Sequence, residues 1–145
     1  MRIIVDTNIV FSAILNSNSK IARIIFQPKT SLNFYSTTKL LEEIKEHKIK
    51  IKAITKLSDE ELDRIITLIT NKIRFINYNL IPIEIYNYAE ELTRDIDIDD
   101  TEFVALTEHI KGKFWTGDKV LIKGLQKKNW NKFINIDELQ LKIKK

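Results

Sequence analysis

Short apolar runs recur along the chain, and most are rich in β-branched or aromatic residues. Runs of this length, bounded by polar or turn-forming residues, are typical of strands buried in a sheet. They predict strands at Arg2–Val5, Leu32–Tyr35, Leu80–Ile83, Lys113–Thr116 and Phe133–Ile136. The two prolines, Pro28 and Pro82, stand where connections between elements are expected.

Between these runs, apolar residues recur at the three- and four-residue spacing of a helix face. The clearest case follows Ser58, which with Glu61 fits a capping box ahead of the stripe Leu62, Ile65, Ile66, Ile69 and Ile73. Further helices are predicted from stripes that begin at Val10, Ile21, Leu40, Ile85, Phe103 and Val120, and in the tail from Asp137 as the N-cap. The Val120 helix is expected to end near Gly124.

Strands that alternate with helices indicate a parallel sheet covered by helices on both faces. The predicted fold class is therefore α/β, a three-layer α/β/α arrangement with a central, mostly parallel sheet of four to five strands. No break in composition, flexible linker or internal repeat divides the chain. We expect residues 1–145 to form a single domain.

The scarce residue types narrow the chemistry that the chain can perform. Its 145 residues include no cysteine, two histidines and three glycines, which excludes thiolate metal sites, cysteine nucleophiles and glycine-rich nucleotide loops. The formal net charge of +4 is compatible with a polyanionic partner and equally with a solvated basic surface. The sequence shows no signal-peptide pattern and no apolar run of membrane-spanning length, so we expect a cytoplasmic protein without a membrane partner.

Acidic residues follow two of the predicted strands directly. Asp6 ends the first strand, and Asp118 comes just after the strand that contains Trp115. In an open parallel sheet, ligands bind outside the carboxyl ends of the strands, so both side chains are expected at one edge. Glu43 and Asp100 lie near the starts of helices that can face the same crevice.

Four carboxylates gathered at one edge repel one another by about 4 kcal/mol per pair at about 4 Å in an effective dielectric near 20. A divalent cation removes this conflict. Hard oxygen ligands suit Mg²⁺ or Mn²⁺, and such ions act on phosphates by activating water and neutralising developing charge. The pattern favours phosphodiester hydrolysis, although each acid taken singly also fits a helix cap, a surface position or a solvated turn.

Three segments, taken in order, carry a family resemblance: Ile3–Asn8, Asp97–Leu106 and Trp115–Lys119. Together they resemble the PIN domain family of metal-dependent ribonucleases, which includes the toxins of VapBC-type toxin–antitoxin pairs. The resemblance implies catalytic and metal-binding roles for Asp6, Glu43, Asp100 and Asp118, with Asp97 as a further metal ligand and Thr7, Asn8 and Thr116 in support. It leaves Glu42 and Glu43 both open as the helical acid.

The implied activity is hydrolysis of single-stranded RNA with one or two Mg²⁺ or Mn²⁺ ions, and the implied partners are RNA, an antitoxin protein and a second copy of the chain in a homodimer. Basic and aromatic side chains would steer the RNA past the acids and stack on its bases. The candidates are Lys39, Lys45, Lys119, Lys123, Lys127, Lys128, Trp115, Trp130 and Tyr35. A strand tryptophan such as Trp115 fits a core position more simply, and helical lysines fit solvated faces.

Two other functions compete with the ribonuclease hypothesis. One is a PIN-like fold used only as an RNA-binding or protein-interaction module, without catalysis. The other is a DNA-directed nuclease, since the same acids would hydrolyse either backbone and the sequence identifies no reader of the ribose 2′-hydroxyl.

Overall fold

The computed structural model describes residues 1–27 and 31–144, so the predicted connection at Pro28 lies outside the described residues. Within these residues, a parallel sheet of four strands forms the centre, in the order β3-β2-β1-β4. The strands are β1 (Arg2–Val5), β2 (Asn33–Thr37), β3 (Ile73–Ile76) and β4 (Lys113–Trp115). The first strand of the chain therefore lies inside the sheet, paired along both of its edges.

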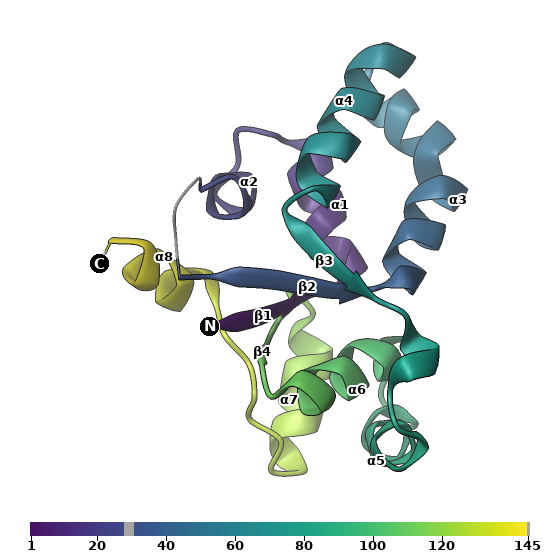
Figure 1. The fold of residues 1–145 in the computed structure, drawn as a ribbon, viewed down its shortest axis with the longest axis vertical. Coiled ribbons are helices and arrows are strands. Elements are labelled where there is room, and N and C mark those ends of the chain that lie inside the picture. The colour runs from purple at the N-terminus through teal and green to yellow at the C-terminus, as the bar shows by residue number, and fades with distance from the viewer. Residues whose placement is uncertain (28–30, 145) are drawn as a thin grey trace.

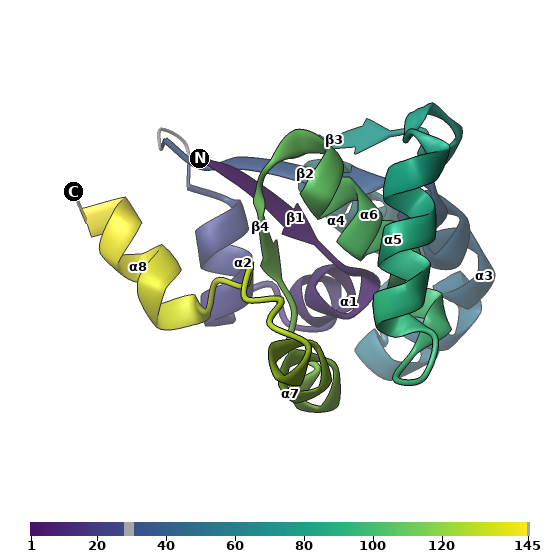
Figure 2. The ribbon, with the colours of Figure 1, turned by 90° about the horizontal axis from the view of Figure 1, so that it is seen from below.

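Helices cover both faces of the sheet, which confirms the predicted three-layer α/β/α fold (Figure 1). One face carries α1 (Thr7–Leu15), α2 (Lys20–Ile25), α3 (Thr38–Thr55) and α4 (Asp59–Thr70). The other carries α5 (Ile83–Thr93), α6 (Thr101–Ile110) and α7 (Lys119–Lys127). The last helix, α8 (Ile136–Lys144), packs beside α2, well away from α3 (Figure 2). No helix in the described part of the chain has the length and apolar character needed to cross a membrane.

Alternate side chains of β1 divide the interior into two hydrophobic cores. Ile3 and Val5 belong to the core beneath α1–α4, and Ile4 belongs to the core on the side of α5–α7. All three side chains are fully buried. This two-sided burial explains why the strand is a continuous apolar run rather than an alternating pattern.

The third strand of the chain begins at Ile73, and the prediction of a strand at Leu80–Ile83 is wrong. α4 ends at Thr70, so Ile73 leaves the helical stripe to which it was assigned and pairs with β2. Residues 78–80 instead form a short 3₁₀ helix, and α5 starts after Pro82. Proline lacks the backbone N–H that a ladder of strand hydrogen bonds needs.

The end of the chain also departs from the prediction. Phe133 makes one isolated bridge, so the strand predicted there does not form. α8 begins at Ile136 and is capped by Asn135, whose Oδ1 accepts a hydrogen bond of 2.8 Å from the Glu138 N–H. Asp137, the predicted cap, lies inside the helix. α7 likewise continues to Lys127, beyond its predicted end near Gly124.

Candidate functional site

The parallel pairing of β1 and β4 places the first acid. Val5 pairs with Trp115, so the next residues along the two strands, Asp6 and Thr116, lie side by side at the carboxyl edge of the sheet. The Thr116 hydroxyl donates a hydrogen bond of 2.5 Å to Asp6 Oδ2, and Asp6 is only 3% exposed. Figure 2 shows β1 running toward the start of α1 at this edge. Strand register thus fixes a buried carboxylate where an open parallel sheet binds its ligands.

Asp6 and Asp118 also begin helices. Asp6 Oδ1 accepts a hydrogen bond of 2.9 Å from the Ile9 N–H at the start of α1, and Asp118 Oδ1 accepts one of 3.1 Å from the Leu121 N–H at the start of α7. The Asp118 N–H donates to the Thr116 hydroxyl at 3.2 Å, which links the two acids through one threonine. Their role as helix caps therefore holds each carboxylate in a defined position.

The third acid comes from the connection between α5 and α6. Ile98–Asp100 forms a 3₁₀ turn there, and Asp97 Oδ1 accepts a hydrogen bond of 3.0 Å from the Asp99 N–H. Asp100 precedes α6 without a side-chain cap hydrogen bond. Carboxylate oxygens of Asp97, Asp100 and Asp118 all lie within 4.8 Å of one another. Oxygens at this spacing can share one cation, because each ligand of a bound Mg²⁺ or Ca²⁺ lies about 2–2.6 Å from the ion.

Buried hydroxyl groups anchor this acidic connection to the helices around it. The Oγ1 atoms of Thr93 and Thr101 lie 2.7 Å apart, and both residues are almost fully buried. The Thr101 hydroxyl donates to the Ile98 carbonyl at 2.7 Å. From α3, Lys39 Nζ donates to the Asp99 carbonyl at 2.8 Å. The acids of the connection are thus held from two sides.

A hollow of about 130 Å³ lies at this edge of the sheet. Its lining is Asp6, Thr7, Asn8, Glu43, Asp97, Asp99, Asp100 and Phe103. Glu43 of α3 is half-buried, whereas its neighbour Glu42 is exposed and does not line the hollow. Asp118 is not among these lining residues, but its carboxylate clusters with those of Asp97 and Asp100, which are. The structure therefore brings together all of the acids that the sequence nominated except Glu42.

Burial and mutual repulsion perturb two of these acids. Loss of solvent, followed by the charges of Asp97, Asp6 and Asp118, raises the pKa of Asp100 to about 7. Burial likewise raises the pKa of Asp6, although the Thr116 hydrogen bond opposes the effect. Carboxylates in such surroundings either take up protons or bind a cation.

The atoms of the hollow fit a hard divalent cation. The acids, the Thr7 hydroxyl and the Asn8 amide that line it offer oxygen atoms, which Mg²⁺ and Mn²⁺ prefer as ligands. Thr7 Oγ1 is buried in this lining and has no hydrogen-bond partner among the described residues, so it is free to contact a ligand or a bound water molecule. The acidic group can therefore hold a divalent metal ion.

The sequence model of the PIN domain family matches residues 4–138, nearly the whole chain. This chain belongs to the PIN domain family. None of the curated proteins compared with it matches significantly. PIN domains are generally nucleases that use divalent metal ions, and the acidic cluster of Asp97, Asp100 and Asp118 is compatible with both properties.

One acid of this PIN domain received no role from the sequence. Glu102, the second residue of α6, is half-buried, and its pKa is raised first by burial and further by the charges of Glu42 and Glu43. The charge of Lys39 and the nearby Thr37 side chain oppose this rise. The sequence could have drawn attention to Glu102, because it is the one ionisable residue in the run Thr101–Thr107, whose other members are all buried.

The tryptophans predicted to stack on RNA bases are core residues of the PIN domain. Trp115 is 1% exposed and Trp130 is 3% exposed, so the prediction that they stack on bases is wrong. The Trp130 Nε1–H donates to Glu108 Oε1 at 2.6 Å, which satisfies its polar atom inside the protein. Tyr35 is half-buried, with the Arg74 guanidinium 6.0 Å from its ring centroid.

The predicted rim lysines differ in what they contact. Lys39 reaches the acidic hollow, where its Nζ lies 4.0 Å from Glu43 Oε1. Lys128 forms an ion pair with Asp95 on the connection before α6. The remaining four are exposed on helices: Lys45, Lys119, Lys123 and Lys127. Basic side chains therefore do not form a closed ring around the acids in the described structure.

Proposed function

We propose that this PIN domain is a divalent-metal-dependent endoribonuclease that hydrolyses phosphodiester bonds of single-stranded RNA. The supporting observation is the convergence of carboxylates from four parts of the fold: Asp6 after β1, Glu43 on α3, Asp100 before α6 and Asp118 before α7. Burial of Asp6 and Asp100 makes this arrangement unfavourable unless a cation or protons compensate it.

Each residue has a role that its position supports. Asp97, Asp100 and Asp118 would hold the metal ion through their clustered oxygens, with Asp6 beside them. A bound Mg²⁺ or Mn²⁺ supplies charge neutralisation and lowers the pKa of water, and the carboxylates are sufficient for one ion or two. Glu43, at the wall of the hollow, would orient the attacking water by accepting its hydrogen bond.

A cleavage assay on matched variants tests the proposal. The protein should cut single-stranded RNA with Mg²⁺ or Mn²⁺ and should stop when EDTA is added. Asp118→Asn should abolish cleavage while keeping α7 capped, because asparagine is an equally good N-cap. Glu43→Gln should slow cleavage by roughly 100-fold. The matched control is Glu42→Gln, an exposed neighbour outside the hollow, which should cut at the parental rate.

The same assay addresses the competing functions. Cleavage by Asp118→Asn at the parental rate would overturn the assignment of the site. RNA binding without metal-dependent cleavage would support a binding module, and preferential cutting of DNA of the same sequence would support a DNA-directed nuclease.

The proposed toxin role and its partners extend this proposal. They rest on the resemblance to toxin subunits and comprise an antitoxin protein and a homodimer. Light scattering on the purified protein tests the dimer. A small neighbouring reading frame that encodes a DNA-binding protein would support the antitoxin.

A further inference from the structure

A second hollow, of about 440 Å³, adjoins the acidic site on the side of α2 and α8. We call it the lysine groove. Its lining is Ile9, Lys20, Ile21, Trp115, Thr116, Gly117, Lys119, Ile122, Asn135, Ile136 and Asp137. Thr116 belongs to this lining and donates to Asp6, while Gly117 and Lys119 flank Asp118 in sequence. The groove is therefore continuous with the proposed catalytic edge through the connection between β4 and α7.

Gly117 is the feature of the groove that neither the backbone nor the packing explains. Its φ is not positive, and a Cβ built there would meet no atom within 4 Å. The other two glycines are required by packing, because a Cβ at Gly112 or Gly124 would lie 2.5 Å from Ile4 or Ile96, respectively. Packing and backbone conformation do not require a glycine at this position. Its missing side chain therefore leaves room for a ligand to approach the backbone closely between the groove and Asp118.

The charge of the groove suits a polyanion. Lys20 and Lys119 are exposed, and neither forms an ion pair in the described structure. Asp137 also lines the groove, so the balance is one positive charge there. Arg23, one turn after Lys20 on α2, adds another cation further along.

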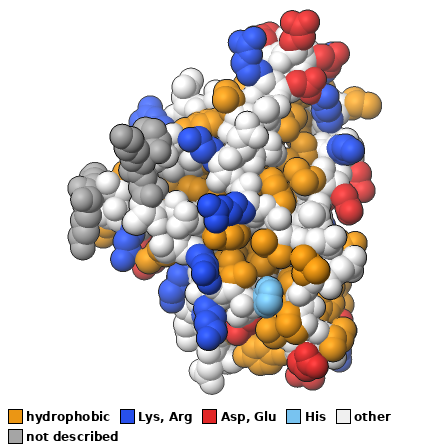
Figure 3. Space-filling view, in the orientation of Figure 1, with side chains coloured by type: hydrophobic (Ala, Val, Ile, Leu, Met, Phe, Trp, Pro, Cys, Tyr) orange, Lys and Arg blue, Asp and Glu red, His pale blue; other side chains and the backbone are white. Residues whose placement is uncertain are grey.

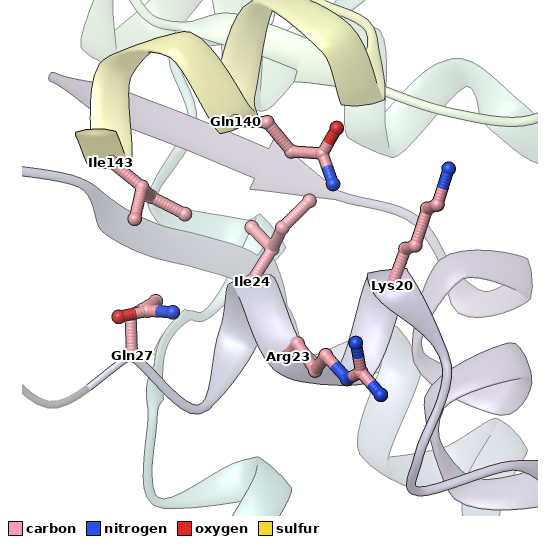
Figure 4. Close-up of a pocket in the computed structure, with 6 residues that line it drawn as sticks. All are labelled: Lys20, Arg23, Ile24, Gln27, Gln140 and Ile143. Atoms are coloured by element: carbon pink, nitrogen blue, oxygen red, sulfur yellow. The ribbon is translucent and has the colours of Figure 1, made fainter.

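The groove continues along α2 into a further hollow of about 330 Å³. Lys20 lines both hollows, and the second lies between α2 and α8 (Figure 4). Figure 4 shows Ile24 on α2 and Ile143 on α8 pointing toward one another, with Lys20 extending from the start of α2. The two hollows, each lined by apolar and basic side chains, thus form a continuous surface that extends from the acidic site along α2.

We propose that the lysine groove binds the nucleotide of single-stranded RNA next to the one whose phosphodiester is cut. The sugar and base would lie over Ile9, Ile21 and Ile122, and the flanking phosphates would contact Lys119 and Lys20. The volume of the groove lies within the range of sites that enclose small ligands, about 300–1,000 Å³. This inference rests on the proposed function, because it assigns the substrate contacts of the same site.

Charge reversal at Lys20 tests the groove. The probe is a fluorescein-labelled RNA octamer, and its binding to the Asp118→Asn protein is followed by fluorescence anisotropy. Lys20→Glu should weaken binding by about fivefold or more, since phosphate contacts dominate affinity for nucleic acids. Lys50→Glu makes the same charge change at an exposed position of α3 outside the groove, and it should bind within about twofold of its parent.

Gly117→Ala provides a second measurement that does not involve charge. The melting temperature should be unchanged or slightly raised, because the added Cβ meets open space. RNA affinity should fall because the added methyl group occupies the space through which the RNA would approach Asp118. In the active protein, Lys20→Glu should raise KM and leave kcat near the parental value.

The outcomes separate the two proposals. Equal RNA affinity of Lys20→Glu and Lys50→Glu, or unchanged affinity of Gly117→Ala, would overturn the groove even if metal-dependent cleavage is established. Loss of RNA binding in Lys20→Glu together with cleavage that survives Asp118→Asn would retain the groove and overturn the proposed catalytic site.

Discussion

At the scale of single residues, Asp100 makes the metal-free protein sensitive to pH. Its pKa is about 7 in the folded state against an ordinary value of 3.8, so the folded protein binds this proton more tightly than the unfolded chain. The free energy of unfolding therefore falls as pH rises between these values and stays low above pH 7. A bound cation that pairs with the carboxylate should remove this effect.

Urea unfolding in EDTA at about pH 5 and about pH 8 measures this contribution. Asp100→Asn should reduce the loss of stability over this interval by about 1–2 kcal/mol relative to the parent, a value discounted for the solvent that still reaches the side chain. Asp137→Asn, an exposed acid on α8, should leave the loss unchanged. Equal pH dependence in Asp100→Asn and the parent would contradict the placement of this carboxylate among like charges.

At the scale of elements, the α5–α6 connection depends on a buried hydroxyl. The Thr101 hydroxyl lies 2.7 Å from both Thr93 Oγ1 and the Ile98 carbonyl, whereas the equally buried Thr107 hydroxyl bonds to the Phe103 carbonyl within α6. Thr101→Val and Thr107→Val should each lower the free energy of unfolding by about 1 kcal/mol. We expect only Thr101→Val to weaken metal binding as well, because of these two hydroxyl groups only that of Thr101 contacts the connection that carries Asp97 and Asp100.

Isothermal titration with Mn²⁺ provides the second measurement for this pair. The informative quantity is the ratio of dissociation constants between the two valine variants, since their effects on global stability should cancel. Identical Mn²⁺ affinities would show that the acids are positioned without the Thr93–Thr101 contact.

At the scale of the whole molecule, α8 closes the core beneath α1–α4. Leu139 is fully buried in that core, while Leu141 on the same helix is 63% exposed. Leu139→Ala should cost about 2–4 kcal/mol of stability in urea unfolding, and Leu141→Ala should cost less than about 0.5 kcal/mol. Similar costs for the two variants would mean that α8 contributes little to the core.

On the face seen in Figure 3, positive charge is spread rather than concentrated. Figure 3 shows Lys and Arg side chains scattered across one face, with acidic side chains mostly toward its rim. A net charge of +4 therefore attracts a polyanion only diffusely on this face. The lysine groove is distinguished by lying against the acidic site, not by the amount of charge it carries.

The sequence by itself determined those features whose interactions span only a few residues. The capping box of α4 is present as predicted, since Ser58 Oγ accepts a hydrogen bond from the Glu61 N–H at 3.1 Å and Glu61 Oε1 accepts one from the Ser58 N–H at 3.2 Å. The buried run of β1 and the cap at Asp6 are equally local. The order of these signals was enough to predict the fold class and the edge at which the acids meet.

Only the tertiary structure decided which side chains share the site and which are hidden. Asp6 and Thr116 are 110 residues apart in the chain, and strand register alone brings them together. The way α3 packs on the sheet places Glu43 in the hollow and leaves Glu42 in solvent. Burial in the core likewise removed Trp130 from the predicted RNA surface. Exposure, carboxylate clustering and strand pairing depend on neighbours that are distant in sequence, which a local pattern of residues does not encode.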